Sequence, residues 1–149
     1  MKNLLRYLIS LGLLASIILV KADLRTHQSE PWATNQLLEP SVLASTINSK
    51  KATQPYTFCI GPGAIIPHSI DMGPAKEKEN LNKLRTELGK LPKDANLVIY
   101  CGCCPFDKCP NIRPAFLLIN ELKFTNARLL NIPHNLKTDW IDKGYPVSK

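Results

Sequence analysis

The chain has 149 residues, of which 19 are Lys or Arg and 12 are Asp or Glu, so its formal net charge is +7. The basic residues are scattered, with no run longer than the pair Lys50-Lys51, so the composition predicts no nucleic-acid partner. The length suits one domain built around one core.

Residues 1–22 predict a secretory signal peptide. Lys2 and Arg6 give a positively charged start, and an apolar run without charges follows. The run Tyr7–Val20 has 14 residues, fewer than the ~18–20 that span a bilayer, which favours cleavage over a retained membrane anchor. We therefore expect a periplasmic or secreted protein that meets a membrane only through its signal peptide.

Residues 23–36 are polar and irregular and predict a linker, so a single domain is expected at 37–149. The expected elements are a helix at 37–47, a strand at 56–60, an extended or looped piece at 64–72, a helix at 77–91, a strand at 96–101, a helix at 115–122 and a strand at 127–132. This alternation of strands and helices predicts the α/β class with a mainly parallel sheet.

Four of the five cysteines lie in one stretch, YCGCCPFDKCPNIRPAF, which covers Tyr100–Phe116. Cys101 ends the expected strand at 96–101, whose continuous apolar character indicates burial on both faces of the sheet. Ligands of parallel sheets bind beyond the carboxyl ends of the strands, where backbone N–H groups converge. Cys101 is therefore the leading functional candidate, and a buried structural thiol is the simpler alternative.

The order of these features resembles the rhodanese-like domain family. The matching features are a strand that ends in Cys101, a loop, Arg113 at the start of a helix, a short strand, the tail Trp140…Gly144-Tyr145-Pro146, and upstream the segment Ile66–Gly73, which is similar to the family's GHIPGAINI. The resemblance extends from Leu37 to Val147. It implies a central, mainly parallel sheet flanked by helices on both faces.

The resemblance also implies a sulfurtransferase that carries sulfane sulfur as a cysteine persulfide. On that scheme Cys101 accepts the sulfur and Arg113 holds the anion, while Gly102, Cys103 and Cys104 line the bound substrate. The implied partners are a small anionic sulfur donor and a thiol acceptor, and the reaction needs no cofactor. The chain departs from the family in its enlarged, cysteine-rich loop, which places eleven residues between Cys101 and Arg113.

The additional thiols allow other interpretations. Cys101 and Cys104 form a C-x-x-C pair, which permits thiol–disulfide redox chemistry with Cys104 as the resolving thiol. Cys109 can close a structural disulfide with Cys103 or Cys104, and its place near Arg113 makes it a rival nucleophile. Because the number of cysteines is odd, at least one thiol is free, bound to a metal or paired with another molecule.

A metal site is a further alternative. Cys101, Cys103, Cys104 and Cys109 form the pattern C-x-C-C-x4-C, whose thiolates suit zinc or copper, and Cys59 can add a ligand from another strand. The chain would then be a non-catalytic thiol–metal or sulfur-carrier module.

The remaining candidates predict structural roles. His68 is expected in a hydrogen-bonded turn, and Trp140 and Tyr145 are expected to pack. The spacing of His134 and Asp139 does not support a relay to a cysteine. A phosphatase also uses a cysteine-loop-arginine cradle, but the eleven-residue loop does not match its spacing.

Overall fold

The computed structural model describes residues 30–49 and 51–148. The expected signal peptide, residues 1–22, and the first part of the expected linker lie outside these residues. Within the described part of the chain, no helix has the length and apolar character needed to cross a membrane.

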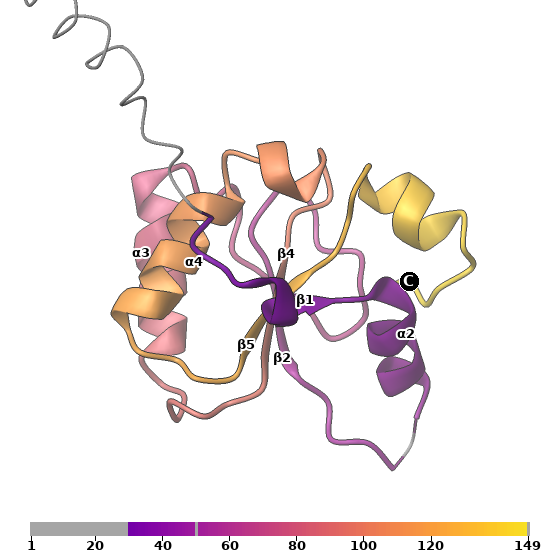
Figure 1. Ribbon diagram of the computed structural model, residues 1–149, viewed down its shortest axis with the longest axis horizontal. Coiled ribbons are helices and arrows are strands. Elements are labelled where there is room, and N and C mark those ends of the chain that lie inside the picture. Colours follow the sequence, from indigo (N-terminus) through magenta and orange to yellow (C-terminus); the bar gives the residue numbers. More distant parts are fainter. Residues whose placement is uncertain (1–29, 50, 149) are drawn as a thin grey trace, which may run out of the picture.

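A five-stranded sheet forms the centre of the molecule (Figure 1). Its strands are β1 (Leu37–Leu38), β2 (Tyr56–Cys59), β3 (Ile70–Asp71), β4 (Leu97–Tyr100) and β5 (Ala127–Leu130). They lie in the order β1-β5-β4-β2-β3, and every neighbouring pair is parallel. The predicted α/β class with a parallel sheet is therefore confirmed. All four residues of the central strand β4 are buried, as expected for a strand covered on both faces.

Helices cover both faces of the sheet. The helical elements are α2 (Pro40–Asn48), α3 (Lys78–Leu88) and α4 (Ile112–Glu121), the 3₁₀ turns η1 (Thr34–Gln36) and η2 (Phe106–Lys108), and the π-helical turn η3 (Lys137–Ile141). Helices α3 and α4 lie on one side of the sheet, and α2 and η3 on the other (Figure 1).

Strand β4 divides its side chains between two cores. Leu97 and Ile99 pack with α3 and α4, whereas Val98 and Tyr100 pack with α2 and η3. Because successive side chains of a strand point to opposite faces, the next residue, Cys101, belongs to the core of α3 and α4. The alternation thus decides which face of the sheet receives the thiol.

The expected helix at 37–47 is wrong at its start. Leu37 and Leu38 form β1 and pair with Leu129 and Leu130 of β5. Pro40 explains the boundary, because a proline disfavours helical backbone in the residue before it, and Glu39 is extended at φ −65° and ψ 138°. The helix therefore begins at Pro40, where the missing N–H leaves no bond unmade.

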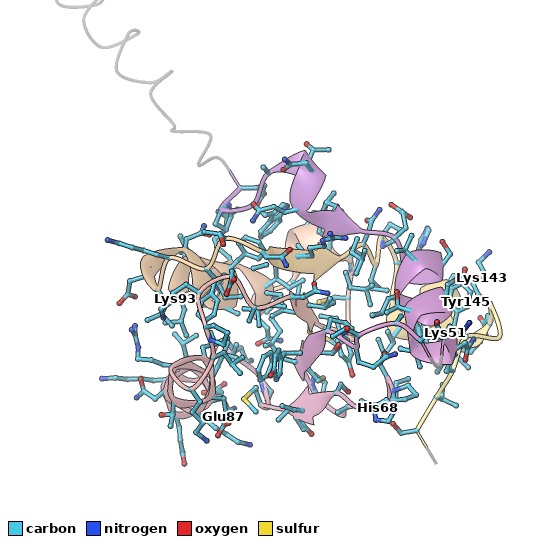
Figure 2. The ribbon with its side chains drawn as sticks, turned by 90° about the horizontal axis from the view of Figure 1, so that it is seen from below. Lys51, His68, Glu87, Lys93, Lys143 and Tyr145 are labelled. Atoms are coloured by element: carbon cyan, nitrogen blue, oxygen red, sulfur yellow. The ribbon has the colours of Figure 1, made fainter. Side chains whose placement is uncertain are left out.

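Two other boundaries differ from expectation for similar reasons. Helix α4 begins at Ile112 rather than Ala115, because Pro114 fits within a first turn, where backbone N–H groups have no partner in the helix. The stretch 64–72 forms only the short strand β3, preceded by a turn in which the Ser69 N–H donates to the Ile66 carbonyl. Exposed His68 takes a left-handed φ of 63° in this turn, and Figure 2 shows it at the edge of the molecule.

The end of the expected linker packs against the domain. Trp32 makes ring contacts with Phe106 and Phe116 at centroid distances of 6.1 and 5.8 Å. Glu30 accepts a 2.7 Å hydrogen bond from Arg113 of α4. This segment therefore covers the start of α4 and the turn η2, so ordered structure begins before residue 37.

The carboxyl-terminal tail packs as expected. Trp140 is fully buried and donates its indole N–H to the Pro146 carbonyl at 2.7 Å, and the Tyr145 ring meets it edge-on at 5.2 Å. Tyr145 and Lys143 line one hollow with Pro40, and Figure 2 shows both beside α2.

Two neighbouring leucines of α4 provide a matched test of the core. Leu118 is 3% exposed, whereas Leu117 is 49% exposed. We expect Leu118→Ala to lower the free energy of unfolding by about 2–5 kcal/mol, because it leaves a cavity under the helix, and Leu117→Ala to change it by less than about 0.5 kcal/mol. Urea denaturation of both variants would measure the difference, and equal losses would contradict the packing of α4.

Candidate functional site

Cys101 lies directly after β4, at the carboxyl edge of the sheet, and is 1% exposed. The neighbouring chain continues past β2 alongside it, since the Ile60 N–H donates to the Tyr100 carbonyl at 2.9 Å. Gly61 then lies against the thiol so closely that a Cβ at that position would fall 2.4 Å from the Cys101 sulfur. The glycine is required here by space, because any side chain would displace the sulfur.

Four thiols gather at this edge. The Cys101 and Cys103 sulfur atoms are 3.3 Å apart, and those of Cys103 and Cys104 are also 3.3 Å apart. The sulfur atoms of Cys101, Cys103 and Cys109 all lie within 4.8 Å of one another. All five cysteines, including Cys59, are free thiols. The Cys101 sulfur thus contacts the Cys103 sulfur, which in turn contacts the Cys104 sulfur. The two cysteines of the expected C-x-x-C pair are therefore linked through Cys103.

Asn111 is the residue at this site that sequence reasoning missed. Its side chain is buried, and its Nδ2 donates to the Cys101 sulfur at 3.4 Å. Its Oδ1 accepts a 3.1 Å hydrogen bond from the backbone N–H of Lys76. Because a backbone N–H can only donate, it fixes the orientation of the amide and leaves the NH₂ group facing the sulfur. No sequence motif marks this asparagine, since its role depends on two segments that meet it in space.

These contacts favour a thiolate at Cys101. The hydrogen bond from the Cys109 thiol lowers the pKa of Cys101, burial raises it, and the Cys103 N–H, the Asn111 amide and the Cys103 thiol lower it further. The result is a pKa of about 5, down from the ordinary value of 9.0. Donors that bond to the charged form outweigh the cost of removing it from water.

The neighbouring thiols shift in the opposite direction. Partial burial, followed by the side-chain hydrogen-bond contacts with Cys104 and Cys101, raises the pKa of Cys103 to about 12. The hydrogen bond to Cys101, followed by burial, raises the pKa of Cys109. Among these three thiols, the contacts therefore favour the negative charge on Cys101 and the protonated form of Cys103 and Cys109.

The cysteine loop is anchored to the chain that follows β5. The Phe106 N–H donates to the Ile132 carbonyl, and the Leu136 N–H donates to the Gly102 carbonyl, both at 3.1 Å. A Cβ at Gly102 would lie 2.8 Å from the Leu136 side chain, so this glycine permits the close approach of Leu136 to the loop. The cysteine loop is thus held by hydrogen bonds at the sheet edge.

Arg113 lies on the first turn of α4, and its guanidinium donates to the Glu30 carboxylate at 2.7 Å. Its side chain is about one-third exposed. The donors to the Cys101 sulfur are instead Asn111, Cys103 and Cys109. The side chains that stabilise the Cys101 sulfur are therefore one asparagine and two cysteines. Arg113 binds Glu30, in the segment before η1.

Cys59, the fifth cysteine, points to the other face of the sheet. It packs with α2 and η3 in the second core, and its thiol lies 3.6 Å from the Gly61 carbonyl and 3.5 Å from the Gly63 carbonyl. Burial raises the pKa of Cys59, so this thiol stays protonated. Cys59 is not one of the three cysteines whose sulfur atoms cluster, which argues against its expected role as a metal ligand.

His134 and Asp139 form a separate, exposed pair. The His134 ring nitrogen Nδ1 lies 2.9 Å from one oxygen of Asp139, and the other oxygen accepts the backbone N–H groups of His134 and Asn135 at 2.7 and 3.2 Å. These bonds shape the loop before η3.

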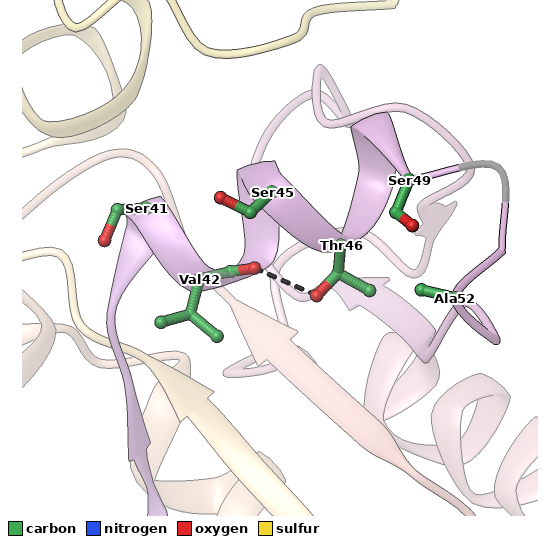
Figure 3. Close-up of a pocket in the computed structure, with 6 residues that line it drawn as sticks. All are labelled: Ser41, Val42, Ser45, Thr46, Ser49 and Ala52. Carbon is green, nitrogen blue, oxygen red and sulfur yellow. Dashed lines mark hydrogen bonds between the residues drawn. The ribbon is translucent and has the colours of Figure 1, made fainter.

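A surface hollow with a volume of about 400 Å³ lies on α2 (Figure 3). It is lined by small and hydroxyl-bearing residues, namely Ser41, Val42, Ser45, Thr46, Ser49 and Ala52. The Thr46 hydroxyl is bonded to the Val42 carbonyl at 2.9 Å, within the helix itself. The lining offers no acid, base or thiol, so the chemically equipped site is the cysteine cluster.

No protein-family model matches the chain, and no curated protein matches it either. The functional argument therefore rests on the chemistry of the cluster itself.

The contact of Asn111 with the sulfur can be tested by titration. A hydrogen bond to a charged group contributes about 1.5–3 kcal/mol, so Asn111→Ala should raise the midpoint of Cys101 ionisation by about one to two pH units. Thiolate absorbance in the ultraviolet, taken as the difference from a Cys101→Ser variant, measures this midpoint. Asn120→Ala is the matched control, because that exposed amide of α4 donates to the Pro31 carbonyl. Identical midpoints in the two asparagine variants would contradict the role of Asn111.

Proposed function

We propose that the chain is a sulfurtransferase in which Cys101 accepts a sulfane sulfur and passes it to a thiol. The observation that carries the proposal is the convergence of donors on the Cys101 sulfur at the carboxyl edge of the central strand. Asn111 at 3.4 Å and Cys103 at 3.3 Å are two of these donors, and the Cys109 thiol is a third. The same donors that favour a thiolate would favour the anionic end of a persulfide.

The first half-reaction requires only a thiolate and an anionic donor such as thiosulfate. The Cys101 thiolate attacks the outer sulfur of thiosulfate, a Cys101 S–S bond forms, and the sulfur–sulfur bond of thiosulfate breaks. The electron pair of the broken bond leaves with sulfite. The products are a Cys101 persulfide and sulfite, and no external oxidant or reductant takes part.

The second half-reaction returns the enzyme to its starting state. An acceptor thiolate attacks the terminal sulfur of the persulfide, and the bond between that sulfur and Cys101 breaks. The electron pair stays on Cys101, which becomes a thiolate again, and the acceptor leaves as a persulfide. A thiol of low pKa is a good leaving group in such exchange, so the environment of Cys101 favours this step.

Membership of the rhodanese-like family and export through a signal peptide form part of the same proposal. The family assignment is supported by the order of strand, Cys101, loop, Arg113 and helix on a parallel sheet. Export rests on the sequence of residues 1–22. The partners would then be a small anionic sulfur donor and a thiol acceptor met in the periplasm or outside the cell.

Sulfur loading tests the proposal directly. Reduced protein exposed to thiosulfate should gain the mass of one sulfur atom on the peptide that carries Cys101, and cyanide should remove it. Cys101→Ser should abolish the gain, because it removes the nucleophile. Cys59→Ser is the matched control, since it removes a thiol on the opposite face of the sheet, and it should load as the wild type does. Loading of the Cys101→Ser variant would contradict the assignment.

A second function, soft-metal binding, is favoured by one observation. Three sulfur atoms, of Cys101, Cys103 and Cys109, lie within 4.8 Å of one another. Three thiolates with metal–sulfur bonds of about 2.3 Å can surround one ion at separations of about 4 Å, and thiolates prefer soft ions such as copper(I) or zinc. Zinc sites commonly have four ligands, and Cys104, 3.3 Å from Cys103, is the nearest additional thiol.

Metal content separates this function from sulfur transfer. If the cluster is a metal clip, reduced protein dialysed against limiting copper(I) or zinc should retain about one ion per chain, and Cys109→Ser should reduce the affinity at least about tenfold by removing a ligand. Cys59→Ser should retain the ion. Equal retention by the Cys109 and Cys59 variants would contradict a site at this cluster. Inductively coupled plasma analysis of the dialysed protein provides the measurement.

A further inference from the structure

Solvent exposure differs sharply between Cys101 and Cys103, whose sulfur atoms are in contact. Cys101 is 1% exposed and walled by Gly61, whereas Cys103, with its sulfur only 3.3 Å away, is an exposed residue. A small anion needs little space, but a peptide or protein thiol must bring its own backbone to the sulfur that it attacks. Because Cys101 is buried, a large acceptor thiol cannot reach its sulfur directly.

We propose that Cys103 is the exit thiol, which takes the sulfane sulfur from buried Cys101 and presents it to a peptide or protein thiol in solution. This inference rests on the proposed sulfur transfer and names the route and the class of acceptor. It stands on two observations, the 3.3 Å separation of the two sulfur atoms and their opposite exposure.

The transfer is balanced within the protein. The anionic Cys101 persulfide takes up one proton from solvent at its terminal sulfur, and the Cys103 thiol releases its own proton to solvent. The Cys103 sulfur then attacks the protonated terminal sulfur of the Cys101 persulfide. A bond forms between Cys103 and that sulfur, and the bond to Cys101 breaks with its electron pair left on Cys101. The products are a Cys101 thiolate and a Cys103 persulfide. An external thiolate then attacks the terminal sulfur on Cys103 and carries it away, and Cys103 regains a proton.

The environments of the two thiols favour this direction. The three donors around Cys101 stabilise it as the departing thiolate, whereas Cys103 has its pKa raised by partial burial and by the neighbouring sulfur atoms. Sulfur exchange runs toward the thiol of higher pKa, since the thiol of lower pKa is the better leaving group. The difference between the two sites thus moves the sulfane sulfur outward.

The other two loop thiols fit this role less well. Cys109 belongs to the same cluster, but it is 5% exposed and donates its thiol proton toward Cys101. Cys104 is half-buried, packs against the first core, and has its sulfur 3.3 Å from Cys103. Cys103 is the member that is both in contact with Cys101 and open to solvent.

Single-turnover discharge distinguishes the relay from direct transfer. Protein loaded with limiting thiosulfate is mixed either with cyanide, a small acceptor, or with glutathione, a tripeptide thiol, and the remaining sulfur is followed by mass spectrometry. The ratio of the glutathione discharge rate to the cyanide discharge rate should fall at least about tenfold in Cys103→Ser relative to wild type, because any effect of the lost Cys101–Cys103 contact acts on both acceptors alike. Cys59→Ser should match the wild type with both acceptors. Because Cys103 is exposed, its substitution does not disturb the core.

The outcomes separate the relay from the function on which it rests. Trapping of added sulfur on Cys103 in loaded wild-type protein, together with the slow glutathione step in the variant, supports the relay. Loading on Cys101 with normal discharge of the Cys103→Ser variant to glutathione overturns the relay alone. Release of sulfide with a Cys101–Cys103 disulfide also overturns it, since Cys103 then attacks the inner sulfur. A wild-type protein that takes up no sulfur overturns both.

Discussion

The site depends on holding one negative charge on a sulfur atom that water does not reach. Burial alone would keep the Cys101 thiol protonated, because a charge removed from water loses its solvation. The Asn111 amide and the Cys103 and Cys109 thiols replace that solvation with hydrogen bonds, and the pKa of about 5 shows that the donors outweigh burial. Each donor is in turn fixed by its own surroundings, as the Lys76 N–H fixes the amide of Asn111.

The parallel sheet is what brings these donors together. All five strands point the same way, so the segments that follow β2, β4 and β5 leave the sheet at one edge. Gly61 follows β2 against the sulfur, and Ile132 follows β5, where its carbonyl accepts the Phe106 N–H of the cysteine loop. Helix α4 then begins beside the loop and carries Asn111 at its amino-terminal boundary. The fold therefore brings these segments together at one edge of the sheet, and the cysteines of the loop lie among them.

The sequence predicted the features that depend on local pattern and missed those that depend on contacts across the chain. The apolar run before Cys101 was sufficient to predict a buried central strand and to place the thiol at its carboxyl end. Asn111 carried no such signal, since it becomes a donor only where the chain at Lys76 and Cys101 meet it. Trp32 was an unexplained aromatic residue in a polar stretch, a signal that could have extended the domain before residue 37.

The geometry of the cluster limits how its two candidate functions can coexist. A Cys101 thiolate bound to a metal donates electron density to the ion and becomes a weaker nucleophile, so metal binding at this thiol competes with sulfur transfer. Oxidation excludes both, because the Cys101 and Cys103 sulfur atoms at 3.3 Å need to approach by only about 1.3 Å to form a disulfide. In an oxidising compartment such a contact between free thiols persists only if a reductant restores it or a bound group occupies it. If the chain is exported as residues 1–22 predict, persulfide formation on Cys101 or metal binding by the three thiols would each protect this contact from disulfide formation.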